Sequence, residues 1–179
     1  MTEFCTPRLL LRHWQEADRE PFADMGADPE VMEHFPALMT RGESEAWIDR
    51  VAADLERRGW GLWAVEELAT GRFIGFTGLN APGFEAPFLP AVEIGWRLRR
   101  DAWGQGYASE AARGVLVAAF EDLGLDEIVS FTARTNVRSQ AVMRRIGMTT
   151  DPAEDFEHPA IAQGRPVRSH VLYRLRRPA

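Results

Sequence analysis

The sequence predicts one domain over residues 1–179 with an α/β (α+β) fold, a mixed sheet whose faces are covered by helices. Segments with strand and helix patterns follow the order strand, helices, three strands, helix, strand, helix and two strands. Helices alternate with strands too sparsely for a doubly wound parallel sheet. The chain has 179 residues, of which 45% are hydrophobic and 27% charged, and this composition suits one globular domain.

In the first half of the chain, apolar periodicity and turn residues indicate a strand, helices and then a pair of strands. Apolar residues recur at helical spacing over 41–58, and Gly59 is expected to end that helix. A turn at Thr70-Gly71 is expected to join two strands. The expected elements are a strand at 8–14, helical segments at 16–25, 29–34 and 41–58, strands at 61–67 and 72–80, and a proline-rich loop at 81–90.

In the second half, a helix with small residues on one face is expected to pack closely on the sheet. Ala111, Ala112 and Val115 share that face. Asn136 is expected to cap the next helix, and Gly147 is expected to end it. The expected elements are a strand at 91–98, a helix at 108–123, a strand at 127–133, a helix at 136–146, and a closing strand pair at 148–156 and 167–174.

A glycine-containing stretch separates the strand at 91–98 from the helix that follows it, and it reads Trp103-Gly104-Gln105-Gly106-Tyr107-Ala108. Gly104 and Gly106 can adopt positive φ and let a ligand approach the backbone. The helix N-terminus adds unpaired N–H groups and the positive end of its dipole. This arrangement predicts a pyrophosphate site, and the alternative is a simple turn.

Composition and charge exclude several classes of protein. Cys5 is the only cysteine, so an internal disulfide or a multi-cysteine metal site is excluded. The net charge of −6 argues against nucleic acid as a partner. Neither a secretory leader pattern nor an apolar run of membrane-spanning length is found, so we expect a cytoplasmic protein without a membrane partner.

Three segments resemble the GCN5-related N-acetyltransferases (GNAT). Residues 92–96 (Val-Glu-Ile-Gly-Trp) and 103–111 (Trp-Gly-Gln-Gly-Tyr-Ala-Ser-Glu-Ala) resemble the acyl-coenzyme A binding signature of that superfamily, and residues 132–148 resemble the segment that follows it. Residues 6–12 (Thr-Pro-Arg-Leu-Leu-Leu-Arg) resemble the start of its ribosomal-protein-acetylating branch. The resemblance implies an acyl-CoA N-acyltransferase fold, with a mostly antiparallel central sheet and helices on both faces.

The resemblance also implies the reaction and the cofactor site. It implies transfer of an acetyl group from acetyl-CoA to a primary amine, by direct attack in a ternary complex. The amine would belong to a protein N-terminus or a small molecule. Trp103 departs from the Gln or Arg that usually opens the signature. The residues implied to bind the cofactor are Trp96, Leu98, Trp103, Gly104, Gln105, Gly106, Tyr107, Ala108, Ser109, Asn136 and Ser139.

Two residues are candidates for proton transfer. Glu93 lies on the strand before the glycine stretch and can serve as the base that deprotonates the amine, directly or through water. The alternative for Glu93 is an exposed strand carboxylate. Many family members carry a tyrosine acid where this chain has Met143, and the related branch implies Ser139 as the replacement. Asn136 can bind the pantetheine arm as well as cap the helix.

Five residues are candidates for the acceptor pocket, and they are Glu33, His34, Phe35, His158 and His170. The four histidines of the chain lack the paired spacing of metal ligands, so we expect no metal. The sequence leaves the acceptor amine open, and it is compatible with either a monomer or a homodimer.

Two other functions compete with acetyl transfer. Gly104-Gln105-Gly106 after a strand, with an acidic residue about 20 positions on, resembles a dinucleotide-binding fingerprint. Ser109 takes the place of the third glycine, however, and only one strand-helix-strand unit surrounds the stretch. The second alternative is an acyl-CoA sensor without catalytic activity, and the presence of Glu93 and Ser139 argues against it.

Overall fold

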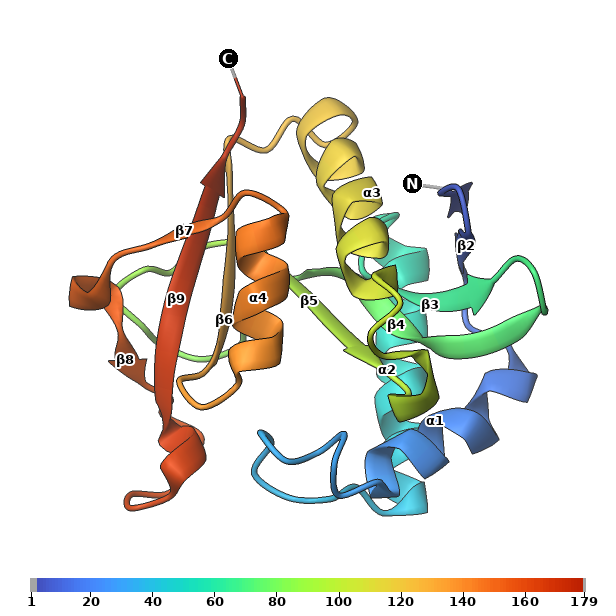
Figure 1. Cartoon of the computed structure of the whole chain (residues 1–179), viewed down its shortest axis with the longest axis horizontal. Coiled ribbons are helices and arrows are strands. Elements are labelled where there is room, and N and C mark those ends of the chain that lie inside the picture. The colour runs from blue at the N-terminus through green and yellow to red at the C-terminus, as the bar shows by residue number, and fades with distance from the viewer. Residues whose placement is uncertain (1–2, 179) are drawn as a thin grey trace.

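The computed structural model describes residues 3–178, which form a nine-stranded sheet with helices on both faces (Figure 1). The strand order is β1-β2-β3-β4-β5-β6-β9-β7, and β8 also pairs with β9. Within the described residues every pairing is antiparallel except that of β5 with β6. The predicted fold class, a mixed and mostly antiparallel sheet, is therefore confirmed.

Most elements begin and end near their expected positions. The strands are β1 (Phe4–Cys5), β2 (Leu9–Arg12), β3 (Leu62–Glu67), β4 (Arg72–Asn80), β5 (Glu93–Leu98), β6 (Glu127–Ala133), β7 (Thr149–Thr150), β8 (Phe156–Glu157) and β9 (Ser169–Arg176). The α-helices are α1 (Arg19–Ala27), α2 (Arg41–Arg58), α3 (Tyr107–Glu121) and α4 (Val137–Arg145). Short 3₁₀ turns cover Glu16–Asp18, Arg100–Ala102, Pro152–Glu154 and Pro166–Arg168.

Two sequence predictions were wrong. Residues 29–34 form turns and not a helix. There the Asp28 side chain accepts a hydrogen bond from the Glu30 N–H at 2.8 Å, and such a local bond competes with helix formation. The expected strand at 148–156 is split into β7 and β8 by the 3₁₀ turn at Pro152–Glu154. The Asp151 carboxylate caps this turn through the Ala153 N–H at 2.9 Å.

The two faces of the sheet are covered by different helices (Figure 1). On one face, α3 and α4 pack over a core that includes Trp63, Ile94 and Val115. On the other face, α1 and α2 enclose a smaller aromatic core around Phe22 and Phe76. Because neighbouring strand residues point to opposite faces, β3 contributes Trp63 to the first core and Ala64 to the second.

None of the helices in residues 3–178 combines the length and the hydrophobicity that crossing a lipid bilayer requires.

Candidate active site

The site is built where β5 and β6 separate. Their only ladder pairing joins Glu93 to Val129, next to a bond from the Val129 N–H to the Val92 carbonyl at 2.9 Å. Beyond that point β5 pairs with β4 alone. Backbone groups alternate in direction along a strand, so the N–H and C=O groups of Trp96 and Leu98 face the gap. The Leu98 carbonyl accepts the Trp103 indole N–H at 2.9 Å, which ties the glycine stretch to β5.

A cleft of about 1840 Å³ runs along this gap. It reaches both faces of the sheet, because Met143 lines it on the α4 side and Trp47 lines it on the α2 side. Of the sequence-predicted site residues, Glu33 is absent from its wall. The others line it together: Glu93, Trp96, Leu98, Trp103, Gly104, Gln105, Gly106, Tyr107, Ala108, Ser109, Asn136, Ser139, His34, Phe35, His158 and His170.

The glycine stretch presents unpaired N–H groups to this cleft. Gly104 has φ 77° and Gly106 has φ 83°, a left-handed conformation that favours glycine. The first backbone bond of α3 runs from the Glu110 N–H to the Gly106 carbonyl. Within the described part of the chain, the N–H groups of residues 104–109 have no acceptor, and α3 has no side-chain cap. The stretch is therefore a preformed site for an anion.

Arg8 lies over the glycine stretch, and the sequence analysis missed it. Its Nη1 donates to the Gln105 carbonyl at 3.0 Å, and its guanidinium pairs with Glu110 at 2.6 Å. The guanidinium carbon also lies 4.6 Å from the centre of the Tyr107 ring. Arg8 and Gln105 are 97 residues apart, and no local sequence pattern links them. A second basic residue, Arg113 on α3, lines the same cleft.

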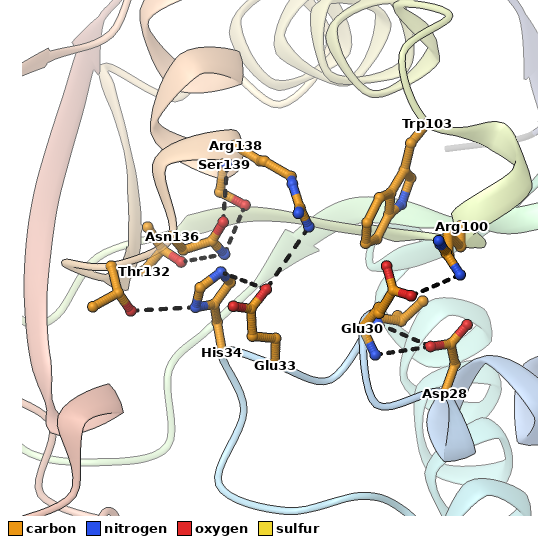
Figure 2. Close-up of polar contacts among 12 residues, drawn as sticks. Asp28, Glu30, Glu33, His34, Arg100, Trp103, Thr132, Asn136, Arg138 and Ser139 are labelled. Carbon is orange, nitrogen blue, oxygen red and sulfur yellow. Dashed lines mark hydrogen bonds and ion pairs between the residues drawn. The ribbon is translucent and has the colours of Figure 1, made fainter.

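The Trp103 ring packs against a cation, the guanidinium group of Arg138. The guanidinium carbon of Arg138, on α4, lies 4.7 Å from the centre of the Trp103 ring. Arg138 also approaches Glu33 at 3.9 Å (Figure 2). A positive charge is thus held across the cleft from β5, near the position where the family signature usually has Gln or Arg.

Asn136 and Ser139 form one network at the start of α4 (Figure 2). The Asn136 Oδ1 accepts the Ser139 N–H at 3.1 Å, so the predicted helix cap is confirmed. The Asn136 Nδ2 donates to the Thr132 hydroxyl at 3.0 Å and to the Ser139 hydroxyl at 3.2 Å. Both amide protons of Asn136 are thereby used, which leaves its oxygen to accept a further bond. The Ser139 hydroxyl proton is donated to no described residue.

Glu93 is a carboxylic acid with an unusual protonation equilibrium. It lies opposite Asn80 on β4 and on the sheet face that carries α1 and α2. Burial raises the pKa of Glu93 to about 8, and a hydrogen bond with Asn80 opposes this only in part. A group with a pKa near neutrality can accept and release a proton under physiological conditions, as a general base must.

Residues 28–40, between α1 and α2, contribute His34 and Phe35 to the wall of the cleft. The His34 Nδ1 lies 3.2 Å from the Thr135 hydroxyl. The His34 Nε2 lies 3.6 Å from a Glu33 carboxylate oxygen (Figure 2). Burial lowers the pKa of His34, so the imidazole is neutral near pH 7. The contact with Thr135 holds the segment against the turn before α4.

The two predicted histidines of the C-terminal segment stand together at the other end of the cleft. The ring centres of His158 and His170 are 5.0 Å apart, and those of Phe131 and His170 are 6.1 Å apart. Burial lowers the pKa of both histidines. This end of the cleft is therefore aromatic and uncharged at neutral pH. Within residues 3–178, no cluster of three or more His, Cys, Asp or Glu residues is placed to hold a metal.

Comparison with known proteins identifies the family. Residues 8–149 match the acetyltransferase (GNAT) domain family. The chain belongs to the GNAT acetyltransferases. This GNAT chain is 35% identical over 153 residues to FsC-acetyl coenzyme A-N(2)-transacetylase of Aspergillus fumigatus, a match that covers 80% of this chain and 63% of that protein.

Solved structures agree with the GNAT assignment. The crystal structure of an acetyltransferase from Agrobacterium tumefaciens is 29% identical and matches with a TM-score of 0.78, covering 99% of this chain and 95% of that one. The ribosomal-protein-S5-alanine acetyltransferase from Vibrio fischeri shares the fold at 15% identity, with a TM-score of 0.75 and coverage of 98% and 97%. The resemblance to the GNAT superfamily is confirmed. With the ribosomal-protein acetyltransferase the chain shares its fold.

The GNAT assignment decides between the competing functions. The chain is an acyl-CoA-dependent N-acetyltransferase, so the sensor without catalytic activity is set aside. The dinucleotide-binding alternative is wrong, because the sheet of residues 3–178 has one parallel pairing and not the run of parallel strands that such folds share.

Proposed function

We propose that this GNAT enzyme moves the acetyl group of acetyl-CoA to a primary amine by direct attack in a ternary complex. The observation that carries the proposal is that one cleft joins the unpaired N–H groups of residues 104–109 to Glu93. The acceptor would be a small molecule or a protein N-terminus. We further propose a single domain over residues 1–179, which the continuous sheet supports, and a cytoplasmic monomer or homodimer.

The residues of the glycine stretch fit a pyrophosphate. Within residues 3–178 their N–H groups have no acceptor, and a Cβ built on Gly104 would meet no described atom within 4 Å. The dipole of α3 and the nearby Arg8 and Arg113 add positive potential. The backbone of Trp96 and Leu98 and the free acceptor capacity of Asn136 would hold the pantetheine arm.

Acetyl transfer from a thioester to an amine has three requirements: the amine must be neutral, the carbonyl oxygen must be stabilised, and the thiolate must be able to leave. When bound, acetyl-CoA supplies the activated acyl carbon. Ionised Glu93 would accept a proton from the ammonium group of the acceptor, and the neutral amine that this leaves would attack the acyl carbon. An unpaired strand N–H near Leu98 would stabilise the developing oxyanion. The Ser139 hydroxyl, whose proton has no acceptor within residues 3–178, would protonate the thiolate to give the free thiol of CoA and would regain a proton from solvent.

The acceptor would enter from the α1 and α2 side of the sheet, onto which Glu93 faces. His34 and Phe35 from residues 28–40 would form one wall, with Glu33 at its edge. His158 and His170 would form the aromatic end. Two neutral imidazoles there would tolerate an apolar or aromatic part of the acceptor better than a charged one.

The assignment of the glycine stretch is tested by Gly106→Trp. Because the indole would occupy the space in front of the N–H groups, we expect acetyl-CoA to raise the melting temperature of the wild type but not of this variant. Gly71→Trp is the matched control, since Gly71 has a similar φ of 68°, has open space around it and does not line the cleft. Equal stabilisation of both variants by acetyl-CoA would refute the assignment.

A further inference from the structure

Arg97 is a charged residue of the cleft for which the proposed chemistry has no use. It lies on β5 opposite Phe76, two residues before the strand enters the turn toward the glycine stretch. Side chains alternate along a strand, so Arg97 shares a sheet face with Gly95 and Glu93. That face carries α1 and α2, and Arg97 lines the cleft there.

The guanidinium of Arg97 has no anionic partner in the described residues. Its Nε is shielded from solvent and has no hydrogen-bond acceptor. Its Nη1 reaches only the Met39 sulfur at 3.4 Å, which is a weak acceptor. Among residues 3–178, no carboxylate lies within 4.0 Å of it. Burial lowers the pKa of Arg97 to about 10, so the group is still charged at neutral pH.

Two aromatic rings hold the guanidinium in place. Its central carbon lies 4.1 Å from the centre of the Phe35 ring and 5.5 Å from that of Phe76. Such stacking uses the faces of the planar group and leaves its N–H edge free for bonding. Phe35 belongs to residues 28–40, so the group lies against the segment that contributes His34 and Phe35 to the wall of the cleft.

Arg12 is another buried arginine of the same chain, and its guanidinium is paired with carboxylates. Arg12 pairs with Asp18 at 2.7 Å and with Glu66 at 2.7 Å. A buried charge without such partners costs folding free energy. Among the described residues, Arg97 is the only arginine with a nitrogen that is both buried and without a hydrogen-bond partner. A purely structural role would not explain why the unpaired charge of Arg97 is kept next to an open cleft.

We infer that Arg97 binds an anionic oxygen group, a carboxylate or a phosphate, on the acceptor, so that the enzyme acetylates amines that carry an acid. Four residues of extended strand separate the α-carbons of Glu93 and Arg97 by ~13 Å. Both side chains line the cleft on the same face of the sheet, and only Gly95, which has no side chain, lies between them on that face. One acceptor could therefore place its amine at Glu93 and its acid at Arg97. The inference rests on the proposed function.

The test compares acidic amines with their neutral counterparts. A series of amino acids with increasing separation of amine and carboxylate is assayed beside the matching carboxamides, and phosphoethanolamine is assayed beside ethanolamine. We expect kcat/KM for at least one acid to exceed that of its neutral partner by about tenfold or more, the value of one charge-assisted bond. The carboxylate and phosphate arms distinguish the two anions.

Variants then assign the preference to Arg97. Arg97→Met should bring the ratio of kcat/KM between acid and neutral partner to near one, and Arg97→Lys should keep part of it because the charge remains. Arg72→Met is the matched control, since Arg72 is an exposed arginine on the adjacent strand that does not line the cleft. Loss of a merely structural contact would change the melting temperature and leave the ratio unchanged.

A binding measurement keeps the test independent of turnover. With CoA bound, an acidic amine should raise the melting temperature of the wild type more than its neutral partner does, and Arg97→Met should remove that difference. Equal behaviour of acids and neutral partners in both assays, or a preference that persists in Arg97→Met, would overturn the inference. In either case, turnover of the neutral amines would still show whether the enzyme transfers acetyl groups, and loss of stabilisation by acetyl-CoA in Gly106→Trp would still test the glycine stretch.

Discussion

Glu93 must lose its proton before it can serve as a base, and its surroundings make that loss difficult at neutral pH. Burial raises its pKa to about 8, so most of the side chain is protonated at pH 7. We therefore expect kcat/KM to rise with pH, to be half-maximal near pH 8 and to level off above about pH 9. Glu93→Gln should lower kcat/KM by about a hundredfold at pH 9 and remove this dependence. Rates of CoA release measured between pH 6 and pH 9.5 provide the check.

A Glu93→Gln enzyme that kept both the rate and the pH dependence would show that the base lies elsewhere. Circular dichroism of the variant at each pH is the control for folding. The Gln side chain preserves the size of the group and its hydrogen bonding toward Asn80, so the change is confined to the lost proton acceptor.

Ser139 is expected to matter less than Glu93. Its hydroxyl is held by Asn136 at 3.2 Å, and a thiolate can leave without much protonation. Ser139→Ala should therefore lower kcat by about tenfold or less, with little change in the binding of acetyl-CoA. Steady-state kinetics and the shift in melting temperature with acetyl-CoA measure the two effects. A loss as large as that of Glu93→Gln would make Ser139 an essential acid.

At the scale of elements, β4 depends on a glycine for its close approach to neighbouring backbone. Gly78 has φ 153°, and a Cβ added there would lie 2.0 Å from the Gly61 carbonyl oxygen. Gly78→Ala should therefore reduce the free energy of unfolding by about 2–4 kcal/mol, as measured by urea denaturation. Gly83→Ala is the control, because a Cβ on Gly83 meets nothing within 4 Å. Equal stability of the two variants would contradict this account.

Elements with a strong local signal could be predicted from the sequence. Three such signals are the Asn136 cap, the left-handed Gly59 at the end of α2 and the glycine stretch. Each depends on a conformation that only a few residue types adopt readily. The turns at 29–34 and the break between β7 and β8 were missed. In both places an aspartate side chain bonds a backbone N–H two residues on, and hydrophobic periodicity does not report such bonds.

At the scale of the whole molecule, the cleft could be predicted only in part. The glycine stretch and the strand before it form one continuous segment of chain, so the resemblance named their cleft residues together. The other contributors come from distant segments. Arg8 meets Gln105 across 97 residues, and Phe35 meets Arg97 from the segment between α1 and α2. The absence of a partner for a charged group depends on every neighbouring element, and only the folded chain shows it.

The separation of β5 from β6 has one more consequence, for the order of events during turnover. The cleft between these two strands reaches both faces of the sheet, with Met143 in its wall on one face and Trp47 in its wall on the other. On the proposed assignment, acetyl-CoA enters the cleft from one face of the sheet and the acceptor amine enters from the other. Neither has to depart before the other can enter, and the enzyme never needs to store the acyl group on one of its own side chains.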